Sequence, residues 1–119
     1  MWLKNANNAA EAKDWAPALT YCNELGDSGY SDWRLPNYME LVSLLDLGYA
    51  DPALSNAAGT EKWSPGNAFT NVQPSYYWTS TTFAGYTDLA WVVNLYNGKV
   101  NGGNKTNSDY YVWPVRAGQ

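Results

Sequence analysis

The spacing of apolar residues changes once along the chain, from the period of a helix to the period of a strand. Over 15–25 the apolar side chains fall at positions i, i+3, i+4, i+7 and i+10, occupied by Trp15, Ala18, Leu19, Cys22 and Leu25. From 76 onward the period is two, and the alternation over 89–96 is the strongest strand signal. A helical first part followed by antiparallel strands predicts an α+β fold.

The ends of two expected helices are marked by residues that satisfy backbone groups. Asp14 is a good N-cap for the first helix, and Gly26 is a suitable C′ residue. Asn37 is the expected N-cap of the second helix, Glu40 stands at the capping-box spacing, and Gly48 ends the helix. The buried face of this second helix is expected to hold Tyr38, Leu41, Val42, Leu44 and Leu45.

Two segments outside the helices complete the first part of the chain. Residues 1–4 are short and apolar, as in an edge strand. Residues 49–75 are irregular and rich in proline, glycine, asparagine and serine, and a loop of this length needs a structural reason. We expect it to cover part of the core with Trp63 and Phe69.

The C-terminal part is expected to be a series of short strands joined by turns. Asn97-Gly98 is the preferred pair for a type I′ hairpin turn, and a short strand returns over 99–101. Gly102-Gly103 is expected to loosen or turn the chain again. Residues 110–116 form the last expected strand, with Tyr111, Trp113 and Val115 on one face, and Pro114 indicates a free edge or a bulge there.

Composition and charge limit the classes of partner that the chain is expected to bind. The 119 residues make one expected domain, 1–119, and 45% hydrophobic composition supplies a core. The net charge is −4 and the seven basic residues are scattered, so nucleic acid is not an expected partner. No apolar stretch approaches the roughly 20 residues of a membrane span, so no membrane insertion is expected.

The chain lacks the residues that most enzyme and metal sites need. It has no histidine and one cysteine, Cys22, which lies in the apolar stripe of the first helix and is expected to be a small buried hydrophobe. No disulfide can form within the chain, and the residues that usually bind zinc are almost absent. The carboxylates form no recognisable pair for acid–base chemistry. We therefore expect no catalytic residue, no cofactor and no metal site.

Motifs throughout the chain resemble those of the Lcl C-terminal domain family, which is named for a bacterial collagen-like adhesin. The most specific is GYSDWRLPN at 29–37 followed by Glu40-Leu41 and Leu44-Leu45-Asp46. The others are Trp15-Ala16 with Tyr21-Cys22-Asn23, Tyr77-Trp78-Thr79-Ser80-Thr81, Ala90-Trp91-Val92-Val93, Gly98, and VWPVR at 112–116. The resemblance covers nearly the whole chain.

The resemblance implies a C-type-lectin-like fold of the formylglycine-generating-enzyme-related branch. In that fold the first and last strands pair, two helices flank the strands, and a long loop region carries the ligand site. Members often carry a cysteine near the position of Pro114 that pairs with one in the first helix, and this chain lacks it. The chain starts abruptly at the first family strand, so upstream sequence, an anchor and the export signal are expected to lie outside it.

Some relatives of this fold are variable proteins of diversity-generating retroelements. Those systems mutate template adenines, so that asparagine codons become tyrosine, serine, aspartate, glycine and others. The C-terminal part of this chain has that composition, and ordinary members share a similar tail. Codons 82–110 are where the resemblance implies variation, and a template repeat beside a reverse transcriptase gene would accompany it.

The C-terminal composition is also typical of a binding face. Tyrosine supplies rigid contact area at low entropic cost, and short polar residues supply adaptable hydrogen bonds. The alternative is ordinary polar surface. Phe83 is either an exposed apolar anchor or, if its loop folds inward, part of the core. The candidate ligand-binding residues are Phe83, Tyr86, Asp88, Asn94, Tyr96, Asn101, Asn104, Asn107 and Tyr110.

Other conspicuous residues are expected to be structural. Trp78, Trp91 and Trp113 lie on alternating strands and are expected to be core. Arg34 is expected to be buried against Glu40 or Asp46, stapling the second helix to the sheet, with anion binding as the alternative. Arg116 is interpreted in the same way.

These observations favour a recognition domain at the extracellular or cell surface, bacterial or displayed on a phage. Its expected partner is a protein or glycan on another cell or surface. One alternative is a structural or assembly module of a surface adhesin, with the tyrosine face in a subunit contact, so an oligomer stays open. Another alternative is a calcium-dependent lectin, although the usual Glu-Pro-Asn and Trp-Asn-Asp runs are absent. Asp88, Asn94 and Asp109 could converge by chance, but their spacing does not indicate a calcium site.

Overall fold

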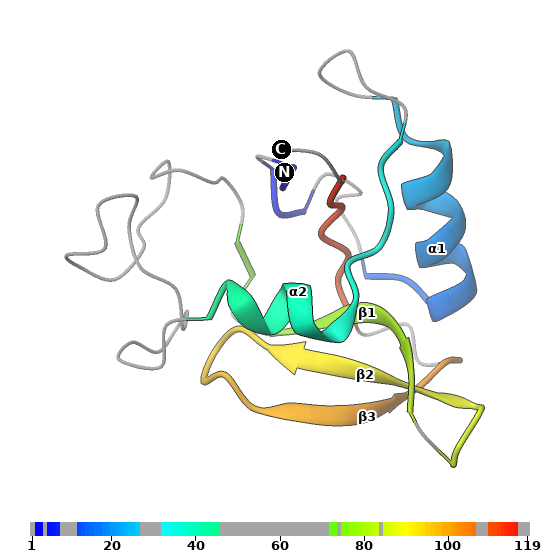
Figure 1. Cartoon of the computed structure of the whole chain (residues 1–119), viewed down its shortest axis with the longest axis vertical. Coiled ribbons are helices and arrows are strands. Elements are labelled where there is room, and N and C mark those ends of the chain that lie inside the picture. Colours follow the sequence, from blue (N-terminus) through cyan, green and yellow to red (C-terminus); the bar gives the residue numbers. More distant parts are fainter. Residues whose placement is uncertain are drawn as a thin grey trace, which may run out of the picture.

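A computed structural model describes residues 2–3, 5–7, 12–26, 32–45, 72–73, 75–83, 85–106 and 110–116. These contain helices α1 (Trp15–Glu24) and α2 (Tyr38–Ser43) and strands β1 (Tyr76–Thr82), β2 (Leu89–Asn94) and β3 (Val100–Asn104). The strands form one antiparallel sheet in the order β1-β2-β3. The predicted α+β architecture, two helices and then an antiparallel sheet, is confirmed (Figure 1). Helix α2 ends at Ser43, with Leu44 as its C-cap, and so stops before the predicted end at Gly48. The predictions for Asp46, Trp63 and Phe69 lie outside the described residues.

Helix α1 follows the predicted apolar stripe, but its ends differ from the prediction. Ala18 and Cys22 are completely buried, whereas Asp14 occupies the N-cap position without a side-chain hydrogen bond. The helix ends at an extended Leu25, whose N–H donates to the Cys22 carbonyl at 3.2 Å. Gly26 does not have the positive φ of a left-handed C′ glycine, because the chain leaves the helix one residue earlier.

Helix α2 begins with the predicted capping box. Asn37 Oδ1 accepts from the Glu40 N–H at 2.8 Å, and Glu40 Oε1 accepts from the Asn37 N–H at 2.9 Å. Leu41 is completely buried, and Tyr38, Val42, Leu44 and Leu45 are partly buried against the same cluster, as the predicted face requires. The reciprocal bonds fix the start of a helix that is too short to be stable alone.

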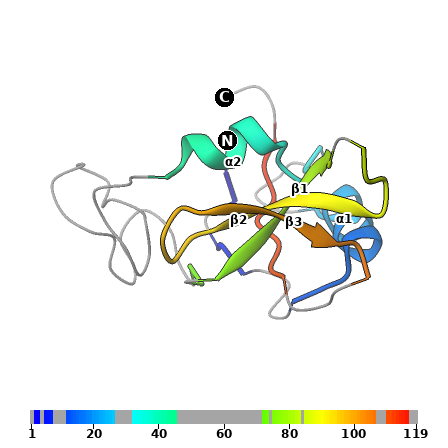
Figure 2. The same cartoon turned by 90° about the horizontal axis from the view of Figure 1, so that it is seen from below.

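Strands β1 and β2 pack against the core on both faces, with α1 and α2 on opposite sides of the sheet (Figures 1 and 2), whereas most of β3 is exposed. Tyr77 and Val93 are paired across β1 and β2 and pack in one cluster with Leu41 of α2. Trp78 and Val92 are also paired and pack in a second cluster with Ala18 and Cys22 of α1. A strand covered on both faces accounts for the nearly continuous apolar run of β2.

The β2–β3 connection is longer than the predicted two-residue turn. Four residues, 95–98, separate Asn94 from Lys99, whose carbonyl accepts from the Asn94 N–H at 2.8 Å. Gly98 has a φ of 81° and donates its N–H to the Asn94 carbonyl at 2.7 Å. The loop is extended because Leu95 is completely buried in the core, where its N–H donates to the Ser75 carbonyl at 2.8 Å.

Gly102 and Gly103 lie within β3 and do not turn the chain, so that prediction is wrong. A Cβ on Gly102 would lie 2.7 Å from Cδ2 of Phe83, and a Cβ on Gly103 would lie 2.6 Å from Cε2 of Tyr110. These glycines let two aromatic rings lie directly against the strand backbone, one on each face of the sheet.

Residues 110–116 form a largely buried extended segment whose faces alternate as predicted: Tyr111 and Trp113 pack in the cluster beside α2, whereas Tyr110 and Val112 pack in the cluster beside α1. Tyr111 makes a parallel bridge to Tyr77, and Val115 makes antiparallel bridges to both Trp2 and Arg34. Pro114 is buried, and its carbonyl accepts from the Leu3 N–H at 3.0 Å. The segment (red in Figure 1) therefore has neighbours on both sides at Val115, so Pro114 does not mark a free edge there, and the alternative of a bulge stays a prediction.

Candidate recognition surface

The sheet has two ends, and the predicted binding residues divide between them. Asn94 and Tyr96 lie at the hairpin end, where 95–98 connects β2 to β3. The loop end is formed by the 82–88 loop and the C-terminal end of β3, because Leu89 pairs with Asn104. The six residues of β2 separate the two ends by roughly 17 Å at the usual strand rise, and Figures 1 and 2 show them on opposite sides of the molecule.

Four of the nine predicted residues gather at the loop end: Phe83, Tyr86, Asp88 and Asn104. The loop turns twice, with the Tyr86 N–H donating to the Phe83 carbonyl and the Leu89 N–H donating to the Tyr86 carbonyl, both at 3.0 Å. Gly85, with a φ of 84°, permits the first turn. Tyr86 is 60% exposed and Asp88 is also exposed, so both residues face solvent from a hydrogen-bonded loop.

Phe83 folds onto the sheet instead of projecting as an anchor. Its ring stacks on Trp91 with centroids 4.4 Å apart, and Trp91 also stacks on Tyr38 of α2 with centroids 5.0 Å apart. Trp78 and Trp113 are completely buried as predicted, but Trp91 is only half-buried and belongs to this aromatic stack. Alternation alone missed this, because Trp91 points to the side of the sheet that α2 covers only in part.

Lys105 fastens the loop to the rest of the molecule, and sequence reasoning did not single it out. Its ammonium donates to Thr82 Oγ1 at 3.1 Å and to the Thr87 carbonyl at 2.7 Å. The same ammonium lies 4.0 Å from the centroid of the Trp15 ring. A lysine next to a polar turn has no distinctive sequence signal, so only the fold reveals this role.

Three asparagines are occupied by their own turns. The side-chain oxygens of Asn94, Asn97 and Asn104 each accept from the backbone N–H two residues later, at 2.8 to 3.0 Å. Such bonds are the usual reason for asparagine in turns. Asparagine in this part of the chain thus stabilises backbone turns. Fewer asparagine side chains are therefore available to a ligand than the sequence suggests.

The remaining predicted residues lie elsewhere. Asn101 is exposed in β3 and donates its amide Nδ2 to the Tyr76 hydroxyl at 2.8 Å. Tyr110 does not face outward as expected: its ring lies edge-on to Trp78, with centroids 4.8 Å apart, and packs against the core cluster beside α1. Tyr96 is 47% exposed at the hairpin end, and Asn107 lies outside the described residues.

The two arginines named from the sequence pair with carboxylates. Arg34 donates to both carboxylate oxygens of Glu40 at 2.7 and 2.6 Å, so the predicted pairing is confirmed, although the pair is partly exposed and not buried. This bond, together with the backbone bond from Asn37, holds the pKa of Glu40 below its ordinary range. Arg116 likewise donates to Asp32 at 2.7 and 3.1 Å and lowers the pKa of that carboxyl.

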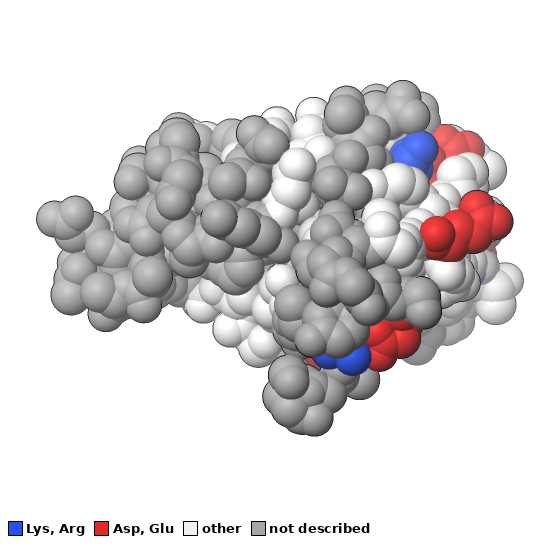
Figure 3. Space-filling view, turned by 90° about the horizontal axis from the view of Figure 1, so that it is seen from above, with Lys and Arg blue, Asp and Glu red and all other residues white. Residues whose placement is uncertain are grey.

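The face drawn in Figure 3 carries charged side chains of both signs, and the described residues hold no metal cluster. Blue and red side chains lie beside one another in Figure 3, and most of the described surface there is white. Among the described residues, no group of three or more histidine, cysteine, aspartate or glutamate side chains could hold a metal ion. Cys22 is buried, which raises the pKa of its thiol to about 12 and keeps it protonated at neutral pH.

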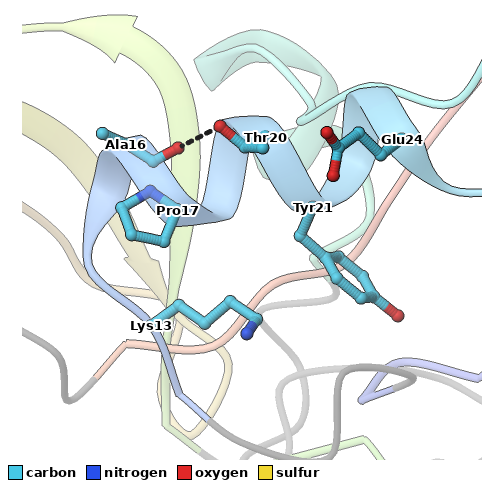
Figure 4. A pocket seen from close by; sticks show the side chains of 6 residues that line it. All are labelled: Lys13, Ala16, Pro17, Thr20, Tyr21 and Glu24. Atoms are coloured by element: carbon cyan, nitrogen blue, oxygen red, sulfur yellow. Dashed lines mark hydrogen bonds between the residues drawn. The ribbon is translucent and has the colours of Figure 1, made fainter.

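One hollow lies outside the predicted surface, along the solvent side of α1 (Figure 4). It measures about 580 Å³ and is open to solvent, with Lys13, Pro17 and Tyr21 among its lining residues. The Lys13 ammonium lies 5.5 Å from the centroid of the Tyr21 ring, and Thr20 donates to the Ala16 carbonyl at 3.2 Å. None of the nine predicted residues lines it.

The family model described as the Lcl C-terminal domain matches residues 1–116. The chain belongs to the Lcl C-terminal domain family. The match spans nearly the whole chain, including both helices, the sheet and the 110–116 segment. No curated protein matches the chain significantly. Among the described residues, no helix of this Lcl C-terminal domain is long and apolar enough to cross a membrane.

Proposed function

We propose that this Lcl C-terminal domain is a ligand-recognition domain that binds a protein or a glycan on another cell or surface and catalyses no reaction. Its recognition surface is the loop end of the sheet. The observation that carries this assignment is the exposure of Tyr86 and Asp88 on a loop that is hydrogen-bonded internally and fastened at its base.

Preorganisation supports the choice of the loop end. A binding loop that already holds its bound conformation loses less entropy when the ligand binds. Phe83 fastens one side of the loop by stacking on Trp91, and Lys105 fastens its base through Thr82 and Thr87. An exposed tyrosine on such a support is a typical binding residue, since its ring gives contact area and its hydroxyl gives a hydrogen bond.

The finer assignment of the fold belongs to the same proposal. We assign the domain to the C-type-lectin-like fold, with its first and last extended segments paired. The antiparallel bridge between Trp2 and Val115 and the bond from the Leu3 N–H to the Pro114 carbonyl support that pairing. On this assignment the domain acts at the extracellular or cell surface, as part of an adhesin or a displayed protein.

A screen against immobilised glycans and against proteins captured from cell surfaces tests the function. Wild-type domain is compared with the double variant Tyr86→Ala, Asp88→Ala and with Tyr96→Ala, which alters an exposed tyrosine at the opposite end. The proposal predicts that the double variant loses ligands that the Tyr96→Ala variant keeps. Retention of every ligand by the double variant would contradict the assignment of the site.

Two further arms of the screen separate the alternatives. Binding that disappears with a chelator and returns with calcium would indicate a calcium-dependent lectin. Light scattering of the same three proteins tests an assembly role: an oligomer that Tyr96→Ala dissociates, without loss of ligand, would place that tyrosine in a subunit contact.

Diversification by a retroelement is the sharper form of the proposal. Its support is the position of the loop end and of β3 within codons 82–110, the stretch in which variation is expected. The flanking DNA tests it directly. A near-identical repeat that differs almost only at template adenines, beside a reverse transcriptase gene, would support diversification, and its absence would end it.

A further inference from the structure

We infer that Lys105 is a positioning residue that fixes the conformation of the 82–88 loop, and thereby the placement of Tyr86 and Asp88. The importance of that placement for binding rests on the proposed function, but the positioning itself does not. Lys105 follows the last residue of β3 and touches neither exposed side chain through its ammonium. Its contacts lie at the base of the loop.

The ammonium of Lys105 joins the two limbs of the loop. Thr82 is the last residue of β1, and Thr87 precedes Asp88 at the return to β2. Bonds to Thr82 Oγ1 and to the Thr87 carbonyl therefore close the base of the loop from both sides. Both distances are within the normal range for a charged donor.

The same residue connects this base to α1. The Lys105 N–H donates to the Asp88 carbonyl at 3.0 Å, and the Lys105 carbonyl accepts from the Trp15 N–H at 3.0 Å. The Trp15 ring lies under the ammonium, and its Nε1 donates to the Thr79 carbonyl at 2.9 Å, which fixes the ring against β1. A cation over a held indole face is favourably placed.

The chemistry of the site suits an ammonium. Lysine has three N–H donors on a flexible stem, and here it meets a hydroxyl, a carbonyl and an aromatic face. Methionine would preserve much of the stem without the charge or the donors. Arginine would keep the charge and can donate to the same oxygens, so it is the conservative variant.

Phe83 holds the first half of the loop independently of Lys105. Loss of Lys105 should therefore affect only the second half. Phe83 stays in contact with Trp91 and lies against Gly102, whatever occupies position 105. Loss of the ammonium should therefore loosen the Tyr86–Leu89 half of the loop. The amides that report it are those of Tyr86 and Leu89, which donate within the loop.

Amide hydrogen exchange measured by NMR tests this inference without any ligand. The proteins are wild type, Lys105→Met, Lys105→Arg and the control Lys99→Met, which removes an exposed lysine at the hairpin end. In Lys105→Met we expect the Tyr86 and Leu89 amides to exchange about tenfold faster, as local opening becomes easier. The Asn94 and Leu95 amides, bonded at the hairpin end, should keep their rates.

Exchange of the Tyr86 and Leu89 amides also shows whether arginine can replace Lys105 and whether the inference is wrong. Lys105→Arg should stay within about threefold of wild type, and Lys99→Met should leave both loop amides unchanged. Unchanged exchange at Tyr86 and Leu89 in Lys105→Met would overturn the inference, as would an equal increase at all four amides. If Lys105→Met does not fold, Thr82→Val removes one acceptor of the ammonium and must still accelerate the loop amides selectively.

This test and the test of the proposed function fail separately. Normal ligand binding by the Tyr86→Ala, Asp88→Ala variant would contradict the recognition surface and leave the exchange result intact. Unchanged loop exchange in Lys105→Met would contradict the positioning role, while Tyr86 and Asp88 could still contact the ligand.

Discussion

The loop end and the hairpin end of the sheet are made of the same residue types, yet they are held in different ways. At the hairpin end, Leu95 is buried in the core and the side chains of Asn94 and Asn97 close turns in their own backbone. At the loop end, Lys105 and Phe83 reach partners distant in sequence, and Tyr86 is left facing solvent. Composition therefore indicates that this part of the chain can bind a ligand. The tertiary contacts then show that the exposed side chains of the loop end are held by residues distant in sequence.

The largest expected effect is at the hairpin end, where Leu95→Ala removes a completely buried side chain. We expect a loss of about 3 kcal/mol in the free energy of unfolding, from lost burial and the cavity left behind. Urea denaturation measures it, with the neighbouring exposed Tyr96→Ala as control, for which the change should stay within about 0.5 kcal/mol. Similar losses for both variants would contradict the anchoring role of Leu95.

The second prediction compares the two glycines of β3. Gly103→Ala should destabilise the domain by about 2 kcal/mol, because the new methyl meets both Tyr110 and the completely buried Val92. Gly102→Ala should cost about 1 kcal/mol, since the half-buried Phe83 ring can shift, and the change should concentrate at the loop end. Thermal unfolding ranks the two variants, and the reverse order would show that the Phe83 contact is the stiffer one.

The third prediction concerns the start of α2, which supports the aromatic stack through Tyr38. Glu40→Gln removes the ion pair with Arg34 and weakens the capping box, and should cost about 1 kcal/mol at pH 7, because solvent screens a partly exposed pair. The folded-state pKa of Glu40 lies below its ordinary value of 4.5. Its contribution is therefore present above pH 4.5 and is lost as the pH falls through the folded-state pKa.

Denaturation of wild type and Glu40→Gln across the acid range checks the sign. The difference in unfolding free energy between them should shrink as the pH decreases below 4.5. A difference that stays constant to strongly acidic pH would show that the charge of Glu40 contributes nothing.

Effects of the same size as that of Glu40→Gln are expected at the two positive-φ glycines, one at each end of the sheet. Gly85→Ala and Gly98→Ala should each cost about 1 kcal/mol, since alanine is strained at a φ near 80°. Asparagine at either position should recover part of the loss, because it tolerates this conformation better. A neutral effect of Gly85→Ala would mean that the 82–88 loop adopts other conformations as readily.

The features that sequence predicted correctly depend on neighbours close along the chain. The stripe of α1 and the capping box of Asn37 and Glu40 are local patterns, and both appear in the structure. The burial of Trp78 and Trp113 also followed from pattern. The pairing of Arg34 was predicted from the chemistry of a guanidinium near carboxylates, and its partner Glu40 is only six residues away.

The features that sequence missed depend on contacts between distant segments. Gly102 and Gly103 looked like a turn because the rings of Phe83 and Tyr110, which require them, are brought there only by the folded sheet. The hairpin turn was expected to be shorter because the alternation over 89–96 continues the strand to Tyr96, whereas β2 ends at Asn94 and the Leu95 N–H bonds to the distant Ser75 carbonyl. Lys105 gained its role in the same way, since its partners lie on β1, α1 and the loop.

Titration of one recovered ligand against two single variants distinguishes the loop end from the hairpin end as the recognition surface. Tyr86→Ala and Tyr96→Ala each remove one exposed tyrosine, at the loop end and at the hairpin end respectively. Recognition at the loop end predicts a Kd at least about tenfold weaker for Tyr86→Ala and a Kd within about twofold of wild type for Tyr96→Ala. Weak binding by Tyr96→Ala together with unchanged binding by Tyr86→Ala would contradict it and move recognition to the hairpin end.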